Sequence, residues 1–261
     1  TFHDHVLKNY EALCRGELDI APDVILVSVP SPLSKLSLSV IICYRLKCWY
    51  SSDHHPFLKY APFKVEQMYI TPDIFIFHNV LYDDEIKVIQ STTSWLKDEE
   101  HPVIARISQR VGHMTGLDMD TANKLQVANY GIGGHYEPHL DFARLIMFQM
   151  SEVEQGGATV FTELGLTLTP IKGAAVFWMN MHPSCEDDLA TRHGACPVLS
   201  GSKWICTKWI HQTGQELKKP CTLEYQKESI YRKILQPVPK KTWQFHPYSA
   251  PQTANHSTNY A

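Results

Sequence analysis

The chain has 261 residues, of which 44% are hydrophobic and 20% are charged, a composition typical of a globular protein with one sizeable core rather than two full domains. A formal net charge of -3 gives no electrostatic basis for binding nucleic acid or an anionic membrane surface. The most apolar stretch, Val24 to Tyr44, is interrupted by prolines, a lysine and serines, so we exclude a transmembrane helix there.

The first segment is expected to be the end of something longer, because it has neither an initiator methionine nor a basic-then-apolar leader. Val6, Leu7, Tyr10 and Leu13 stand at helical spacing, which predicts the tail of a helix from a preceding region. A segment broken by proline and serine follows and shows no clear periodicity. We therefore assign residues 1–65 to a linker and the end of an upstream region, with an atypical apolar insertion.

Clearer signals begin after Pro72. The run "IFIFHNV" predicts a strand, and Asp83 with Asp84 marks the start of a helix that continues, imperfectly, through "EIKVIQSTTSWL". A second helix is predicted in "HPVIARISQRVGHM", where four apolar residues share one face: Ile104, Ile107, Val111 and Met114.

After Leu117 the pattern changes to seven short β-rich runs separated by glycine-rich or polar turns: "KLQVANY", "HYEPHLDF", "LIMFQM", "ATVF", "LTLTP", "GAAVFWM" and "KWICTKWIHQ". Helices followed by many short strands predict an α+β fold, in which helices buttress an antiparallel barrel or sandwich. We assign residues 66–235 to this domain. The proline-rich and polar residues 236–261 are predicted to be a disordered tail.

Seven cysteines are an odd number and too few for a disulfide scaffold, and the absence of CxxC argues against a structural zinc site. Disulfides between well-separated cysteines and buried free thiols are both compatible with this count.

The strongest chemical signal is His139-Leu-Asp141, just beyond a glycine-rich turn in "YGIGGHYEPHLDFAR". On a strand, residues i and i+2 point to the same face, so an imidazole and a carboxylate would lie side by side toward the barrel interior. A lone His-x-Asp also arises by chance, and a polar strand edge is the alternative interpretation. One more inward histidine would complete a 2-His-1-carboxylate Fe(II) site.

His193 is the candidate for that third ligand, because it precedes an apolar run and follows several predicted strands. Farther along, the alternation of a strand places Lys203, Ile205, Thr207 and Trp209 on one face of "KWICTKWIH". A lysine on an inward face requires an anion. The alternative is that Lys203 faces outward and Lys208 inward.

From about Lys124 to Leu223 the chain resembles the catalytic domain of collagen-type prolyl 4-hydroxylase alpha subunits. The resemblance rests on "LQVANYGIGGHYEPHLDFAR", "EQGGATVF", "KGAAVFWMN", "TRHGACPVLSGSKW", "KWIHQTGQE" and "PCTL". That family consists of Fe(II)- and 2-oxoglutarate-dependent dioxygenases. The resemblance implies a double-stranded β-helix, a jelly-roll-like core, with buttressing helices.

Carried over residue by residue, the resemblance makes His139, Asp141 and His193 the iron ligands. Lys203 would pair with the distal carboxylate of 2-oxoglutarate, and Tyr130 and Thr207 would be further contacts to this co-substrate. The implied reaction is hydroxylation of peptidyl proline at C4 in procollagen-like substrates, coupled to oxidative decarboxylation of 2-oxoglutarate. Ascorbate would rescue iron oxidised in unproductive cycles.

The resemblance also implies residence in the lumen of the endoplasmic reticulum and protein disulfide isomerase as a beta subunit. It further implies two disulfides, Cys14 with Cys48 and Cys196 with Cys221, and leaves the pairing of Cys43, Cys185 and Cys206 open.

Three departures from the family pattern bear on activity. Residues are missing after "DEIKVIQ" and after "DFAR", where the family has a support strand and a long loop near the substrate, and the apolar stretch around 21 to 43 is extra. Two alternatives therefore stand beside the proline hydroxylase: a non-catalytic alpha-subunit-like protein that only binds a partner, and an oxygenase acting on another residue such as lysine.

Overall fold

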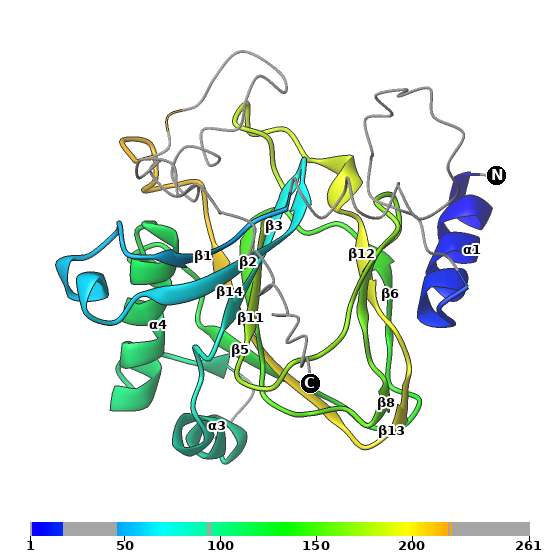
Figure 1. Cartoon of the computed structure of the whole chain (residues 1–261), viewed down its shortest axis with the longest axis horizontal. Helices are drawn as coiled ribbons and strands as arrows, with labels where there is room; N and C mark the ends of the chain where they lie inside the picture. The colour runs from blue at the N-terminus through cyan, green and yellow to red at the C-terminus, as the bar shows by residue number, and fades with distance from the viewer. Residues whose placement is uncertain (1, 18–45, 93–94, 219, 221–261) are drawn as a thin grey trace, which may run out of the picture.

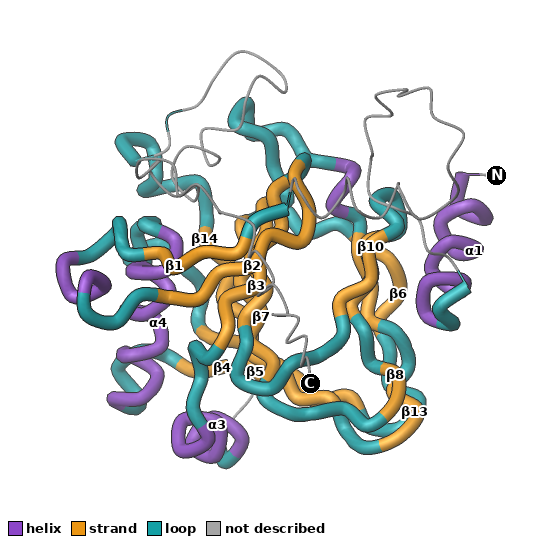
Figure 2. Tube along the Cα trace, viewed as in Figure 1, coloured by secondary structure: helices purple, strands orange, loops and turns teal. Residues whose placement is uncertain are grey.

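The computed structural model describes residues 2–17, 46–92, 95–218 and 220. The strands form two main antiparallel sheets (Figures 1 and 2). The larger sheet has the strand order β1 (Cys48–Ser51), β2 (Phe63–Ile70), β3 (Asp73–His78), β11 (Ala175–Met179), β7 (Arg144–Gln149), β14 (Lys203–Ile210), β5 (Leu125–Tyr130) and β4 (Trp95–Leu96).

The smaller sheet has the order β10 (Leu166–Leu168), β9 (Thr159–Phe161), β12 (His193–Ala195) and β6 (Tyr136–His139). A two-stranded ribbon pairs β13 (Val198–Ser200) with β8 (Gln155–Gly156). The described residues also form two short 3-10 helices, η1 (Pro56–Lys59) and η2 (Leu189–Thr191). The α+β prediction, with a jelly-roll-like antiparallel core buttressed by helices, is confirmed.

The larger sheet is buried on both faces. In β7, alternate residues serve the two sides: Ile146 and Phe148 pack in the core under the helices, whereas Leu145 and Met147 pack in the core that faces the smaller sheet. Figure 1 shows α3 (Asp83–Gln90) and α4 (Pro102–Thr115) beside the larger sheet, on the side away from β6 and β12. One face of this sheet is therefore structural and the other faces the space between the sheets.

The predicted helical face of α4 is confirmed, since Ile104, Ile107, Val111 and Met114 are all fully buried. The first helical residue is Pro102, and the side chain of the N-cap residue His101 accepts from the Val103 N–H. The C-cap residue is Gly116, with a left-handed φ of 68.

The helix that starts at Asp83 was expected to continue through "STTSWL", and this prediction is wrong. α3 ends at Gln90. The Ser91 hydroxyl donates to the Val88 carbonyl and the Thr92 hydroxyl to the Ile89 carbonyl, so side chains compete for the last backbone groups. Trp95–Leu96 then pairs with β5 as an edge strand.

The segment expected to be a linker contributes to the sheet, because β1 pairs with β2 at its edge. α1 (Phe2–Cys14) confirms the predicted N-terminal helix and lies outside the smaller sheet, beside β6 and β12 (Figure 1). The boundaries at 65 and 235 stay predictions.

None of the helices in the described part of the chain combines the length and apolarity needed to cross a membrane. Val24–Tyr44 and the predicted tail lie outside the described residues.

Both predicted cysteine pairs, Cys14 with Cys48 and Cys196 with Cys221, are wrong, because Cys14 forms a disulfide with Cys196. The physical reason is the docking of α1, whose Tyr10 and Leu13 pack with Val160 and Cys196. Cys48 starts β1 on the opposite side of the molecule and is an exposed free thiol (Figure 1). Cys43 and Cys221 lie outside the described residues, Cys206 is a buried free thiol, and Cys185 is exposed.

Candidate metal centre and co-substrate pocket

The two histidines of the predicted ligand set come from neighbouring strands. His139 is the last residue of β6 and His193 the first of β12, and the antiparallel register places them directly opposite each other. Their ring centroids are 4.5 Å apart. Strand pairing thus brings together two residues that are far apart in the sequence.

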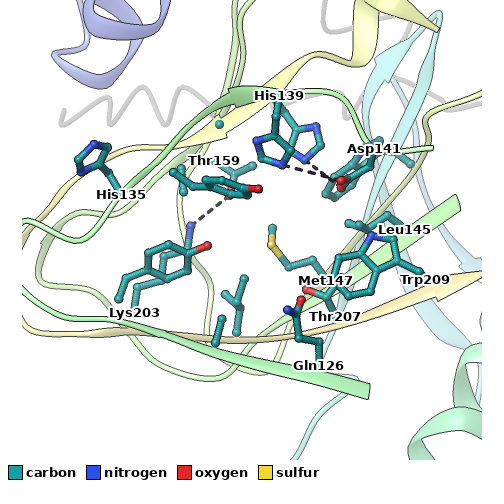
Figure 3. A pocket seen from close by; sticks show the side chains of 18 of the residues that line it. Gln126, His135, His139, Asp141, Leu145, Met147, Thr159, Lys203, Thr207 and Trp209 are labelled. Carbon is teal, nitrogen blue, oxygen red and sulfur yellow. Dashed lines mark hydrogen bonds and ion pairs between the residues drawn. The ribbon is translucent and has the colours of Figure 1, made fainter. Parts of the chain in front are cut away.

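Asp141 completes the cluster, although it lies just beyond β6 and not on the strand as expected. Its Oδ1 is 3.9 Å from His139 Nε2 and its Oδ2 is 3.5 Å from His193 Nε2. The three side chains offer ligand atoms that all lie within 4.8 Å of one another. Figure 3 shows His139 and Asp141 at one end of a cavity, which His193 also lines. The structure therefore brings the three predicted residues together.

The loop that carries Asp141 is held from β11. The Asn180 side chain is completely buried, and its Nδ2 donates to the Ala143 backbone carbonyl at 2.6 Å. The Trp178 indole donates to the side-chain oxygen Oδ1 of Asn180 at 2.8 Å. Trp178 also packs edge-on against the His193 ring. One pair of side chains therefore supports both the carboxylate loop and a histidine.

Backbone carbonyls determine which histidine nitrogens face the cluster. His139 Nδ1 lies 2.8 Å from the Glu137 carbonyl and His193 Nδ1 lies 2.9 Å from the Thr191 carbonyl. A carbonyl can only accept, so each Nδ1 carries a proton, and in the neutral form of each ring it is Nε2 that presents a lone pair toward Asp141. Three electron-pair donors then converge without a hydrogen between them, which fits a divalent cation.

The environment favours the charge states that a metal requires. Desolvation, followed by the neighbouring His193, lowers the pKa of His139, which keeps its imidazole neutral. Desolvation alone would raise the pKa of Asp141, but the hydrogen bond and charge of His193, with smaller contributions from His139 and Trp209, lower it. A carboxylate and neutral imidazole match the Fe(II) donor set.

Lys203 lies in the same cavity, which has a volume of about 390 Å³. Only 1% of Lys203 is exposed, and its ammonium donates to the Thr159 hydroxyl at 3.2 Å and lies 5.7 Å from the centre of the Tyr130 ring. Burial lowers its pKa to about 8. Among the described residues no carboxylate lies within ion-pair distance of Lys203, so an anionic ligand would complete its environment.

The predicted face of β14 is confirmed: Ile205, Thr207 and Trp209 line this cavity with Lys203, and Tyr130 lies opposite Lys203 in the sheet. Lys208 points to the other face and is also buried, with its ammonium 3.2 Å from Asp98 and 2.8 Å from Ser108. The alternative, in which Lys203 faces outward and Lys208 inward, is wrong for Lys203, which lines the cavity. Lys208 is buried as well, because both faces of this strand are covered.

Sequence reasoning missed several residues around the cluster. Tyr136 stacks on His139 with centroids 4.0 Å apart, and Thr159 contacts Lys203. The i, i+3 spacing of Tyr136 and His139 carries no strand signal. Asn180 follows a buried strand, and nothing in the pattern distinguishes it from a turn residue. Trp209 had been placed on the face of Lys203 by the alternation of β14, but without a role at the site.

Comparison with known proteins relates this geometry to a family. Residues 125–211, which include all six predicted site residues, match the 2OG-Fe(II) oxygenase superfamily. Prolyl 4-hydroxylase subunit alpha-2 of Caenorhabditis elegans is 40% identical over 259 residues, covering 82% of this chain and 45% of that protein. Prolyl 4-hydroxylase subunit alpha-1 of Homo sapiens is 38% identical over 261 residues, covering 83% and 46%.

Among solved structures, the viral collagen prolyl hydroxylase of Paramecium Bursaria Chlorella virus-1, in its 2OG complex, has a TM-score of 0.49 and 24% identity, over 52% of this chain and 93% of that one. The chain spans less than half the length of the curated relatives it matches. The resemblance predicted from the sequence is confirmed: residues 125–211 match the 2OG-Fe(II) oxygenase superfamily, and the chain is similar to the alpha subunits of prolyl 4-hydroxylases.

Proposed function

We propose that the chain is a catalytic unit of the procollagen-proline 4-dioxygenase type, which hydroxylates peptidyl proline at C4 and decarboxylates 2-oxoglutarate. The observation that carries this proposal is one cavity that joins a His139–Asp141–His193 cluster to a buried lysine without a carboxylate partner among the described residues. A divalent cation and a dicarboxylate would satisfy the two ends together.

His139 Nε2, an Asp141 carboxylate oxygen and His193 Nε2 would hold Fe(II). When bound, iron would activate O2 for the decarboxylation and the hydroxylation. The protein's own contribution is orientation, because the carbonyls of Glu137 and Thr191 fix the two rings through their Nδ1 protons.

Lys203 would pair with the distal carboxylate of 2-oxoglutarate, with Thr159 holding its ammonium in place and Tyr130 and Thr207 beside it. Leu145, Met147 and Ile205 give the cavity apolar walls. These walls limit water near the co-substrate and so strengthen the pairing of charges. Catalytic roles are proposed here for His139, Asp141, His193 and Lys203.

The substrate would be a proline-rich, collagen-like peptide. Ascorbate would keep iron reduced, protein disulfide isomerase would be the partner, and the lumen of the endoplasmic reticulum would be the compartment. The related alpha subunits support the reaction, and the Cys14–Cys196 disulfide supports an oxidising compartment.

The peptide side of the site is expected to be weak. Only residues 140–143 connect β6 with β7, which leaves little chain to cover a bound peptide. Misplacing the reacting carbon by about 1 Å costs roughly 100-fold in rate. We therefore expect slow hydroxylation, with part of the succinate formed without hydroxyproline, and a marked dependence on ascorbate.

The test is incubation of the chain with Fe(II), 2-oxoglutarate, ascorbate and O2, using a proline-rich peptide and a matched peptide with lysine in place of proline. Mass spectrometry and chromatography would identify the modified residue, with His139→Ala as the inactive control. We expect 4-hydroxyproline. Oxygen added only to lysine would identify an oxygenase for another residue, and peptide binding without succinate formation would identify a non-catalytic protein.

A further inference from the structure

The strand that carries His193 is short and irregular. β12 contains three residues, His193–Ala195, and its register against β6 shifts between His193 and Ala195. Such bulges disturb the ladder of hydrogen bonds and redirect the neighbouring side chains. The direction of the His193 ring therefore depends on how this irregular stretch of backbone is held.

Tyr10 of α1 holds it from outside the sheet. The tyrosine is 7% exposed, and its hydroxyl donates to the Ala195 carbonyl at 2.8 Å, on the far side of the register shift from His193. Desolvation, aided by Glu137, raises the pKa of Tyr10 to about 12, so this hydroxyl keeps its proton.

The Tyr10 ring also closes over Gly194. A Cβ atom on Gly194 would lie 3.1 Å from Tyr10 Cε2, 2.9 Å from the Tyr136 carbonyl oxygen and 3.2 Å from the Pro138 nitrogen. Gly194 is thus enclosed between the Tyr10 ring and β6, the strand that ends in His139. One side chain thus contacts β12 beside one histidine, and Gly194 lies between this side chain and the strand that leads to the other histidine.

The rest of α1 keeps Tyr10 in position. Leu13 packs with Val160 and Cys196, and Cys14 bonds covalently to Cys196. The Asn9 amide donates to the Thr162 carbonyl at 3.2 Å, beyond the end of β9. Helix docking thus has several contacts, of which the Tyr10 hydroxyl reaches the β12 backbone next to a proposed metal ligand.

We infer that Tyr10 is a positioning residue for the metal centre, which sets the aim of His193 through the bulged backbone of Gly194 and Ala195. The inference rests on the proposed function in that it assumes the two histidines bind a metal. It assigns a role to the N-terminal helix, which lies outside residues 125–211. Groups that orient metal ligands typically change metal affinity by about 10- to 100-fold when removed.

The test compares Tyr10→Phe with Asn9→Ala, each of which removes one hydrogen bond between α1 and the smaller sheet. The full chain is used with its disulfide intact, so α1 stays tethered in both variants. Co(II) is the probe, because its visible absorption reports coordination geometry as well as occupancy. Affinity and spectrum are measured well below the melting temperature of each variant.

We expect Tyr10→Phe to weaken Co(II) binding about 10-fold and to alter its spectrum, whereas Asn9→Ala lowers only the melting temperature. Wild-type affinity and spectrum in Tyr10→Phe would overturn the inference, as would equal losses in both variants. Failure of the wild-type chain to bind Co(II) or Fe(II) would overturn the proposed function instead, so the two failures are distinguishable.

Discussion

Two buried lysines on one strand show how the two faces of the larger sheet differ. Lys203 and Lys208 both belong to β14, with 1% and 3% exposed. Lys208 lies against the helical layer, where its ammonium, the Ser108 hydroxyl and Asp98 are mutually hydrogen-bonded. Lys203 faces the cavity, with a hydroxyl and an aromatic ring as its neighbours.

Burial alone therefore does not distinguish a structural charge from a functional one. A buried ammonium that already pairs with a carboxylate of the chain belongs to the scaffold. A buried ammonium without such a partner is prepared to bind an anion that comes from outside. The predictions below test this division between the helical face and the cavity face.

The largest effect is expected at the metal end of the cavity. His193→Ala removes one of three ligands, so metal binding and succinate formation should fall below detection while the chain stays folded. His139→Ala and Asp141→Ala should behave alike. A matched control is His78→Ala on β3. The His78 ring lies 2.8 Å from the Glu66 carboxylate and does not line the cavity. Turnover retained in the His193 variant would show that the third ligand is wrong.

The next largest effect is expected for Lys203→Met. Loss of the ammonium leaves the distal carboxylate of 2-oxoglutarate unpaired in an apolar site, which should cost about 3 to 5 kcal/mol of binding. The free energy of unfolding should stay the same or rise, because a buried charge without a carboxylate partner is removed. Calorimetric titration and chemical denaturation measure the two quantities. An unchanged affinity for 2-oxoglutarate would move Lys203 out of the co-substrate site.

Lys208→Met should give the opposite result. Asp98 and Ser108 lose a charged donor, so the free energy of unfolding should fall by about 1 to 3 kcal/mol. Affinity for 2-oxoglutarate should be unchanged, because Lys208 lies on the helical face. Adding Asp98→Asn should recover part of the loss, since the half-buried carboxylate is then no longer left without its cation. A weakened co-substrate affinity in Lys208→Met would break the division between the two faces.

The smallest effect concerns pH. Burial lowers the pKa of Lys203 from 10.5 to about 8, so between these values the unfolded chain binds the additional proton. The free energy of unfolding should therefore rise by about 1 kcal/mol between pH 7 and pH 9 relative to Lys203→Met. Affinity for 2-oxoglutarate should fall over the same range, by up to tenfold per pH unit above about 8. A flat affinity profile in the wild type would contradict a charged Lys203 as the anion partner.

Periodicity made much of this molecule predictable. The alternation of β14 indicated which residues accompany Lys203, and the 3.6-residue spacing of α4 indicated Ile104 and Ile107 as core. The cluster could also be predicted from the sequence, because short motifs and strand order suffice to bring His139, Asp141 and His193 to one end of the sheets.

Contacts between residues distant in the sequence were not predictable in the same way. Asp98 is 110 residues from Lys208, and the pairing of Cys14 depends on which sheet α1 docks against. The position of Asp141 in a loop depends on Asn180, whose buried amide holds the Ala143 carbonyl. These features arise from packing, for which local patterns carry no signal.

The most direct test of the account is the ratio of 4-hydroxyproline to succinate formed by the wild-type chain from a proline-rich peptide, with Fe(II), 2-oxoglutarate and ascorbate. Both products should appear, both should vanish in His193→Ala, and the ratio should be below one because residues 140–143 form a short connection. Absence of both products from a chain that binds the metal would contradict the account.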